Sequence, residues 1–175
     1  NILLDGLVAD GKAPFERLFA EALSECAMDV AALMHGDAGP DASVVETLAQ
    51  AARAHHGILK KCLADFRSPA VHIEPSFISP RWGLQGRLDL LLEHGGARRD
   101  VIELKSGKAP GSSGPWKNDE AQALCYELML DSTFPEREGT GCILYCSDSG
   151  GGTPLRRVES GTTARQNVLM ARNRV

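Results

Sequence analysis

Apolar residues recur at three- and four-residue steps along the first third of the chain, which is the spacing of one buried helix face. In the first such stretch the apolar positions are Phe15, Leu18, Phe19, Leu23, Cys26 and Val30. The Gly39-Pro40 pair ends this pattern, and Asp41 or Ser43 can cap a second helix that runs towards Ala64 or Phe66. We therefore expect a helical region over residues 1–70.

From residue 71 onward, short apolar runs bounded by turn residues favour strands. Candidate strands cover residues 71–78, 84–92, 101–106 and 142–145, and an edge strand is expected over residues 155–158. The second and third are joined by residues 93–96, whose two glycines suit a hairpin turn. Helical spacing returns over residues 121–129 and again over residues 162–174.

This order of elements predicts an α/β fold, in the α+β sense of a central mixed sheet flanked by helices. With 175 residues, 43% of them hydrophobic, the chain is long and apolar enough for a single domain over residues 1–175. Residues 71–160 would form its core and residues 161–175 a terminal helix. Because the chain begins at Asn1, we interpret it as a piece of a longer protein.

The formal net charge of -4 gives the chain no overall attraction to nucleic acid. Any DNA binding has to come from local basic residues, a metal ion or a neighbouring domain. The five cysteines, an odd number, indicate a reducing compartment, so we expect a cytoplasmic location, or a nuclear one if the parent is eukaryotic. No apolar run approaches the roughly 20 residues that span a bilayer, so no membrane partner is expected.

Two acids and a lysine stand near the ends of adjacent predicted strands. Glu103 and Lys105 share one face of their strand while Leu104 would face the core, and the hairpin places Asp89 on the neighbouring strand. Both carboxylates, with the backbone carbonyl of Leu104, can hold Mg²⁺ or Mn²⁺, which prefer oxygen ligands. The alternative is that the three charged residues form an ordinary surface salt bridge.

Three longer motifs resemble the RecB-like branch of the PD-(D/E)xK nucleases. They are EPSFISPRWGLQGRLD at residues 74–89, IELKSGK at residues 102–108 and QALCY at residues 122–126. Within that branch the likeness is greatest to the nuclease domains of replication helicase–nucleases that process Okazaki fragments, and more distant to the CRISPR-adaptation exonucleases. The resemblance implies a restriction-endonuclease-like core and a metal-dependent nuclease for single-stranded or flapped DNA, with a helicase domain in the same parent chain.

The resemblance also implies roles for individual residues. Asp89 and Glu103 would be metal ligands, Lys105 the catalytic lysine, and Gln122 and Tyr126 contacts to the DNA strand. For Tyr126 the alternative is packing under the sheet. Glu74 either bonds a basic neighbour or ends a strand. Further basic residues that can follow a DNA strand are Arg81, Arg87, Lys108 and Lys117.

The sequence departs from the family pattern in two places. The family carries an early G-x3-H-E motif whose histidine is a further metal ligand, but residues 11–19 contain no histidine. Glu16 is the candidate replacement, and its alternative is a solvated helix charge. The cysteines that hold an iron–sulfur cluster in many relatives are missing from both ends, so we expect no cluster in this fragment and structural or incidental cysteines. We interpret His55 and His56 as surface residues.

Two tryptophans flank the candidate site in the sequence. Trp82 and Trp116 can each stack on an unpaired base, or pack into the core or its rim. The rival to the nuclease hypothesis, motivated by the missing histidine, is a degenerate nuclease fold that only binds nucleic acid or a protein partner.

Overall fold

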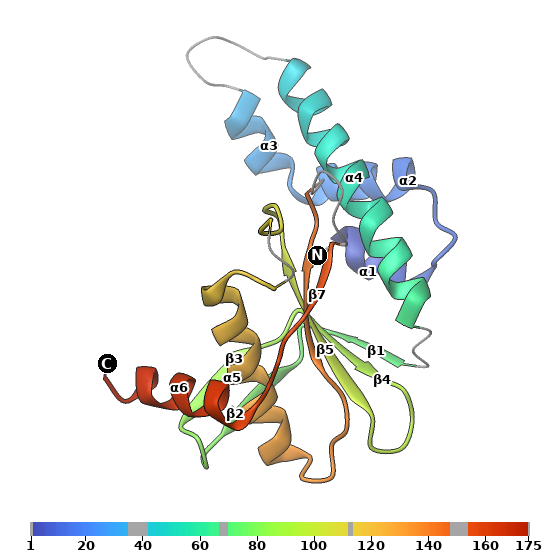
Figure 1. The fold of residues 1–175 in the computed structure, drawn as a ribbon. Helices are drawn as coiled ribbons and strands as arrows, with labels where there is room; N and C mark the ends of the chain where they lie inside the picture. Colours follow the sequence, from blue (N-terminus) through green and yellow to red (C-terminus); the bar gives the residue numbers. More distant parts are fainter. Residues whose placement is uncertain (1, 35–41, 67–69, 112–113, 148–153, 175) are drawn as a thin grey trace. The chain divides into compact units, whose positions relative to one another are not determined.

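The computed structural model describes residues 2–34, 42–66, 70–111, 114–147 and 154–174. The chain divides into two compact units, residues 1–65 and residues 66–175, and each is described by itself (Figure 1). The predicted helix breaker Gly39-Pro40 and the candidate cap Asp41 lie outside the described residues. The single domain over residues 1–175 stays a prediction.

The first unit is helical. Its elements are α1 (Ile2–Ala9), α2 (Phe15–Glu25), α3 (Ala27–Met34) and α4 (Ala42–Phe66). The prediction of one helix from Phe15 to Val30 is wrong, because Cys26 leaves the helical region at φ -95° and ψ 21° and separates α2 from α3. As α3 begins at the next residue, the three- and four-residue spacing of apolar positions continues through the break. The predicted second helix is confirmed as α4.

The interpretation of His56 as a surface residue is also wrong. Its ring is buried and lies edge-on to the ring of Phe15, with 5.6 Å between the ring centroids. Burial is the main reason that the pKa of His56 lies below its ordinary value. His55 next to it is half-buried. His56 therefore belongs to the packing of the first unit.

The second unit contains a five-stranded sheet. In spatial order its strands are β1 (Ala70–Ile73), β4 (Leu90–Glu93), β5 (Arg99–Lys105), β6 (Gly141–Tyr145) and β7 (Leu155–Arg157). Only the β5–β6 pair is parallel; the other neighbours are antiparallel, so the sheet is mixed. The hairpin between β4 and β5 is confirmed, and Gly95 and Gly96 in its turn take φ values of 86° and 60°. The predicted edge strand is confirmed as β7.

Two predicted strands are each divided in two. Residues 71–78 become β1 and β2 (Ser76–Ser79), and residues 84–92 become β3 (Leu84–Arg87) and β4. Strands β2 and β3 pair with each other in a separate two-stranded sheet. The chain leaves the large sheet at Glu74, whose φ of 50° is uncommon for a residue other than glycine, and at Pro75, which has no N–H to donate.

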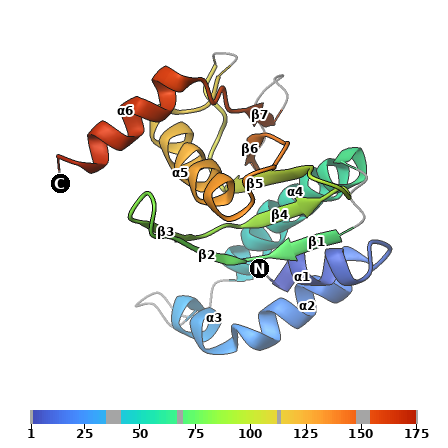
Figure 2. The same ribbon diagram turned by 90° about the horizontal axis from the view of Figure 1, so that it is seen from below.

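Helix α5 (Lys117–Thr133) connects the parallel strands β5 and β6, and Figure 2 shows it packed against the sheet, with α6 (Thr162–Arg172) beside it. Most of α5 between Ala123 and Leu130 is buried. One face joins a core cluster with Leu88, Leu91 and Val101, and another joins a cluster with Ile143, Tyr145 and Val158. The predicted α/β class, a central mixed sheet flanked by helices, is confirmed.

A buried carboxylate fixes α5 in this position. Glu127 is fully buried, and its Oε1 accepts a hydrogen bond from the backbone N–H of Gly141 at the start of β6. Its Oε2 lies 3.4 Å from Nη2 of Arg165 on α6, which also pairs with Asp131 at 2.7 Å. One side chain thereby connects α5 to the sheet and to α6.

We predict that Glu127→Ala lowers the free energy of unfolding by about 3 kcal/mol, because it leaves the Gly141 N–H without its acceptor and opens a cavity. Arg165→Ala should destabilise as well, and the double variant should lose less than the two single losses added together. Urea unfolding measures all three. The control is Gln166→Ala, an exposed neighbour on α6. A Glu127→Ala midpoint equal to that of the control would contradict the prediction.

Candidate active site

Asp89 lies in the irregular segment between β3 and β4, where the chain returns to the large sheet. Its backbone carbonyl accepts a hydrogen bond from the Glu74 N–H at 3.0 Å. Its side-chain Oδ2 accepts one from the backbone N–H of Leu104 at 2.6 Å. The prediction that Asp89 is part of a strand is therefore wrong, but the structure places it directly beside the Glu103–Lys105 end of β5.

Glu103 and Lys105 lie at the C-terminal end of β5, the central strand of the sheet. Glu103 is 4% exposed, whereas Leu104, which the sequence placed toward the core, is only half-buried. Lys105 Nζ donates hydrogen bonds to Glu103 Oε1 at 2.9 Å and to Gln122 Oε1 at 2.7 Å. The expected ion pair of Glu103 with Lys105 is present, but because Glu103 is buried it is not an exposed surface salt bridge.

Helix α5 brings two more predicted residues to the same place. Gln122 Nε2 donates to Glu103 Oε1 at 2.6 Å and lies 2.8 Å from the hydroxyl of Tyr126, one turn further along the helix. The ring of Tyr126 is buried in the core cluster against β3, where a Cβ on Gly86 would lie only 3.0 Å from it. Tyr126 thus packs under the sheet with its ring and reaches the site with its hydroxyl.

Asp119 also belongs to this group, although none of the sequence motifs points to it. Its Oδ1 lies 3.8 Å from Lys105 Nζ, and its Oδ2 accepts a hydrogen bond from the Tyr145 hydroxyl at 2.8 Å. Asp119 precedes Gln122 by three residues on α5, a spacing that places both on one helix face. That spacing is the signal in the sequence that could have identified Asp119, but Asp119 lies outside the motif at residues 122–126.

Burial and the charges of neighbouring acids determine the pKa values of Glu103 and Lys105. Burial, with a further contribution from the charge of Asp89, raises the pKa of Glu103 to about 7. Burial acts to lower the pKa of Lys105, but its hydrogen bond to Glu103 and the charges of Glu103, Asp119 and Asp89 outweigh this, so its pKa lies above the ordinary value. Lys105 is therefore an ammonium ion at neutral pH.

The donor set fits a divalent cation of the Mg²⁺ class. Glu103 Oε2 is buried and accepts no hydrogen bond within the described part of the chain, and the carboxylate of Asp89 lies beside it. An oxygen-binding cation would relieve both the missing partner and the repulsion. Among the described residues, no three His, Cys, Asp or Glu side chains gather into a possible metal site. Mg²⁺ is commonly bound by one or two carboxylates and keeps several waters.

Glu16, the candidate third ligand, belongs to the first unit. It lies on α2, and its Oε1 accepts a hydrogen bond from Arg53 Nη2 at 3.1 Å. Its relation to Asp89 and Glu103 stays a prediction.

The predicted DNA-binding residues Arg81 and Arg87 contact side chains outside the group of Glu103, Lys105 and Gln122. The guanidinium of Arg81 lies over the ring of Trp82 at 4.9 Å, and Arg87 pairs with Glu74 at 3.2 Å. Glu74 therefore does bond a basic neighbour. Lys108 is exposed in the loop after β5. Within the described residues, none of these three cations forms an ion pair with Asp89 or Glu103.

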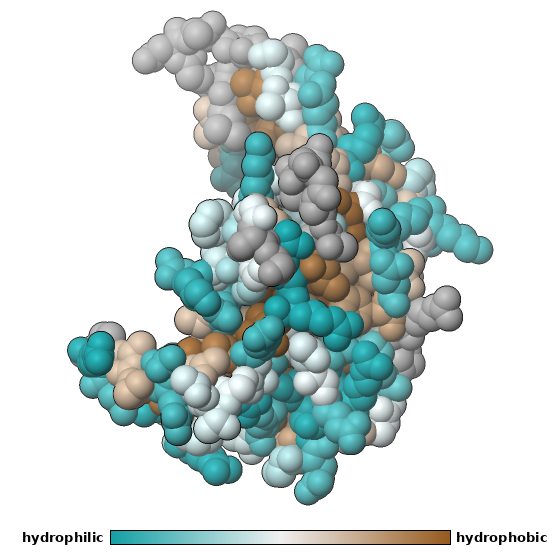
Figure 3. All heavy atoms as spheres, in the orientation of Figure 1, coloured by the Kyte–Doolittle hydropathy of each residue, from teal (hydrophilic) through white to brown (hydrophobic). Residues whose placement is uncertain are grey.

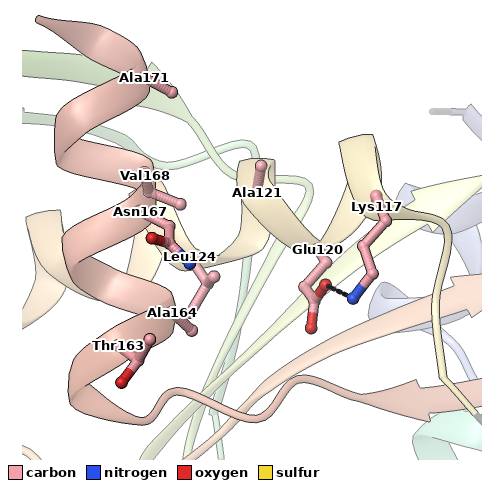
Figure 4. Close-up of a pocket in the computed structure, with 9 residues that line it drawn as sticks. All are labelled: Lys117, Glu120, Ala121, Leu124, Thr163, Ala164, Asn167, Val168 and Ala171. Carbon is pink, nitrogen blue, oxygen red and sulfur yellow. Dashed lines mark hydrogen bonds and ion pairs between the residues drawn. The ribbon is translucent and has the colours of Figure 1, made fainter.

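An apolar groove of about 560 Å³ lies elsewhere, between α5 and α6. Figure 3 shows apolar residues gathered there on a largely hydrophilic surface, and Figure 4 shows Leu124, Ala164 and Val168 along it, with the Lys117–Glu120 ion pair at one end. Gln122 is not among the residues that line it. The candidate chemistry therefore lies on a different face of α5 from this groove.

The cysteines supply no thiolate to the site, although the Cys146 backbone N–H donates to the Lys105 carbonyl at 2.7 Å. All five are free thiols. Burial raises the pKa of Cys142 to about 12 and that of Cys146 to about 11, so neither is a thiolate at neutral pH. Cys26, expected to be buried on a helix face, is exposed at the break between α2 and α3.

Comparison with known proteins supplies a family. The model of the PD-(D/E)XK nuclease superfamily matches residues 6–168, which is most of the chain. Members of this superfamily are generally metal-dependent nucleases with a restriction-endonuclease-like fold, consistent with the mixed sheet found here. No curated protein matches the chain. Within the described residues, no helix is both long and apolar enough to cross a membrane.

We predict that the metal-free protein loses stability as pH rises from about 4.5 to about 7, relative to Glu103→Gln. The folded state holds the Glu103 proton up to about pH 7 and the unfolded state releases it near 4.5, so deprotonation favours unfolding across this window. A shift of this size corresponds to about 3 kcal/mol.

Urea unfolding in EDTA at pH 4.5, 6 and 8 measures this difference. The other titrating groups are common to both proteins, so they do not contribute to it. Glu136→Gln, which removes an exposed carboxylate, is the matched control and should follow the wild type. Parallel pH curves for wild type and Glu103→Gln would show that the idea is wrong.

Proposed function

The chain belongs to the PD-(D/E)XK nuclease superfamily, and on this premise we propose that it is a metal-dependent nuclease domain that hydrolyses the phosphodiester bonds of single-stranded or flapped DNA. The observation that carries the proposal is the convergence of Asp89, Glu103, Lys105 and Gln122, from three separate segments, into one hydrogen-bonded group. In it the buried Oε2 of Glu103 has no N–H donor within the described residues, and the Glu103 carboxyl group interacts with that of Asp89. A structural ion pair alone does not account for a buried carboxylate oxygen that lacks a donor.

Asp89 and Glu103, with the carbonyl of Leu104, would hold Mg²⁺ or Mn²⁺, and Glu16 is the proposed further ligand. When bound, such an ion polarises the phosphate and lowers the pKa of a coordinated water. Glu103 has to be ionised to bind a cation, so its raised pKa makes cation binding compete with a proton and weaken as pH falls.

Lys105 would orient the attacking water or stabilise charge on the phosphate. An ammonium group has three N–H donors, and two of them are used by Glu103 and Gln122. Asp119 at 3.8 Å is beyond hydrogen-bond distance, which leaves the third donor for water or a phosphate oxygen. Its raised pKa supports a cationic role and speaks against Lys105 as a general base.

Gln122 is proposed as the positioning residue for this lysine. Its amide oxygen accepts from Lys105 and its amide nitrogen donates to Glu103, so a single side chain fixes both partners. Tyr126, whose hydroxyl lies beside the Gln122 amide, would contact the DNA strand together with Arg81, Arg87 and Lys108. Arg87 would exchange its pairing with Glu74 for a phosphate.

The biological setting is proposed from the sequence motifs. We infer a RecB-like domain that acts in DNA replication or repair, in the cytoplasm or in a nucleus, with a helicase domain in the same parent chain. The net charge of -4 supports a neighbouring domain that contributes to DNA affinity.

The second candidate function is a binding module that has lost catalysis. The absence of histidine from residues 11–19 favours it. The preserved group of Asp89, Glu103 and Lys105 favours the nuclease, since two adjacent acids repel DNA phosphate unless a cation lies between them. Binding that is indifferent to Mg²⁺ and Mn²⁺ would support the module.

We predict that Asp89→Asn, Glu103→Gln and Lys105→Ala each lower the cleavage rate of end-labelled single-stranded and flapped DNA by at least about 100-fold, because each removes a group needed around the reacting phosphate. The assay compares Mg²⁺ with Mn²⁺ in the intact chain, and circular dichroism checks that each variant is folded. Lys61→Ala, an exposed lysine on α4, is the control. Cleavage that survives in all three folded variants would refute the nuclease assignment.

We predict separately that Gln122→Ala lowers kcat by about 10- to 100-fold with little change in KM, since Lys105 loses its orienting acceptor. The acid limb of the pH–rate profile should also move to higher pH, because Glu103 loses a donor to its charged form. Asn118→Ala, an exposed residue on the same helix, is the control. Kinetics of Gln122→Ala equal to those of the control would argue against a positioning role.

A further inference from the structure

Trp116 immediately precedes α5 and is 55% exposed. Its indole N–H donates to the backbone carbonyl of Lys108 at 3.0 Å, and its backbone N–H donates to the Tyr145 hydroxyl at 3.0 Å. The indole therefore has its polar atom satisfied and its orientation fixed, while much of its apolar surface faces solvent. A fixed aromatic ring of this kind binds a flat partner with little loss of conformational entropy.

The position of Trp116 relative to Lys105 follows from a short chain of contacts. The Tyr145 hydroxyl that accepts from the Trp116 N–H also donates to Asp119 at 2.8 Å, and Asp119 lies 3.8 Å from Lys105 Nζ. Trp116 is thus connected to the proposed catalytic lysine through two side chains that both belong to the second unit.

Trp82 does not offer the same surface. Its ring is half-buried and carries the Arg81 guanidinium over it at 4.9 Å. Its Nε1 is buried and has no hydrogen-bond partner among the described residues. Of the two tryptophans, Trp116 is therefore the one with an accessible and oriented ring.

Two exposed lysines are connected to Trp116, one through a hydrogen bond and one as its neighbour in the chain. Lys108, whose carbonyl holds the indole, is exposed, and Lys117 follows Trp116 directly and is also exposed. Lys117 pairs with Glu120 at 2.8 Å, a surface ion pair of the kind that is easily exchanged for another anion. An exposed aromatic ring with lysines close to it in the chain is the combination that binds the bases and phosphates of an unpaired strand.

We propose that Trp116 is a stacking platform for an unpaired base of the substrate strand, with Lys108 and Lys117 contacting the adjacent phosphates. This inference rests on the proposed function and deepens it: the ring selects single-stranded segments, because bases in a duplex are already stacked on one another. Trp116 is a substrate-binding residue here, separate from the acids and the lysine that act on the phosphate.

The test measures binding of the intact chain in EDTA and low salt, so that cleavage does not enter. The chain has two tryptophans, so Trp82→Phe leaves Trp116 as the only indole. We expect a dT12 oligonucleotide to quench the fluorescence of Trp82→Phe and to leave that of Trp116→Phe nearly unchanged. Trp116→Ala should lower the affinity for dT12 by roughly 5- to 150-fold, with little change for a blunt duplex.

A 12-nucleotide strand of abasic sites separates stacking from phosphate binding. The wild type and Trp82→Phe should prefer dT12 to this strand, and Trp116→Ala should bind both equally. Unchanged dT12 affinity in Trp116→Ala, absence of quenching in Trp82→Phe, or failure of the wild type to bind dT12 would each overturn the proposal. Failure of the nuclease assignment is detected separately, by the cleavage assay with divalent metal.

Discussion

The hydrogen bond between the Leu104 backbone N–H and Asp89 Oδ2 is the contact on which the site depends. Strand β4 pairs with β5 only as far as Leu90 opposite Ile102, because the chain before Leu90 turns away into β3. The N–H of Leu104 consequently has no strand partner on that side, and an unsatisfied amide costs about 1–3 kcal/mol. The carboxylate of Asp89 takes the place of the missing carbonyl. The same contact brings Asp89 beside Glu103.

Without a bound cation, the adjacent carboxylates of Glu103 and Asp89 destabilise the folded state. A fold that keeps such a pair indicates that the pair serves a function. A buried carboxylate next to a second acid is destabilising, and Lys105 and Gln122 compensate only one of its two oxygens. Two other buried carboxylates of this unit have their oxygens paired: Glu127 bonds the Gly141 N–H and Arg165, and Asp100 bonds the Thr140 N–H and Arg98. A conflict such as the one at Glu103 is typical of functional sites. The rest of the second unit shows how the chain satisfies a buried acid when no ligand is involved.

The sequence predicts α4, α5, α6, the hairpin and the central strand well, because each has a local signal in spacing or turn residues, but it does not show the break at Cys26 between α2 and α3. It does not show that the chain changes sheets at Glu74 and again at Leu88, because apolar spacing is the same whether a strand continues or a new one begins. Asp119 and the buried His56 were missed for a related reason. Their positions depend on contacts between elements, which no window of neighbouring residues records.

The charge balance of the chain restricts how any DNA strand is held. With a net charge of -4 and acids around Lys105, long-range attraction to phosphate is weak, and a cation between Asp89 and Glu103 can neutralise only the reacting phosphate. Affinity for the rest of the strand then has to come from contacts that are not electrostatic. Stacking on a fixed ring such as Trp116 is one of these, and it is insensitive to base identity because every base presents an aromatic face. Under the proposed function, a site built this way would distinguish unpaired from paired DNA without reading sequence.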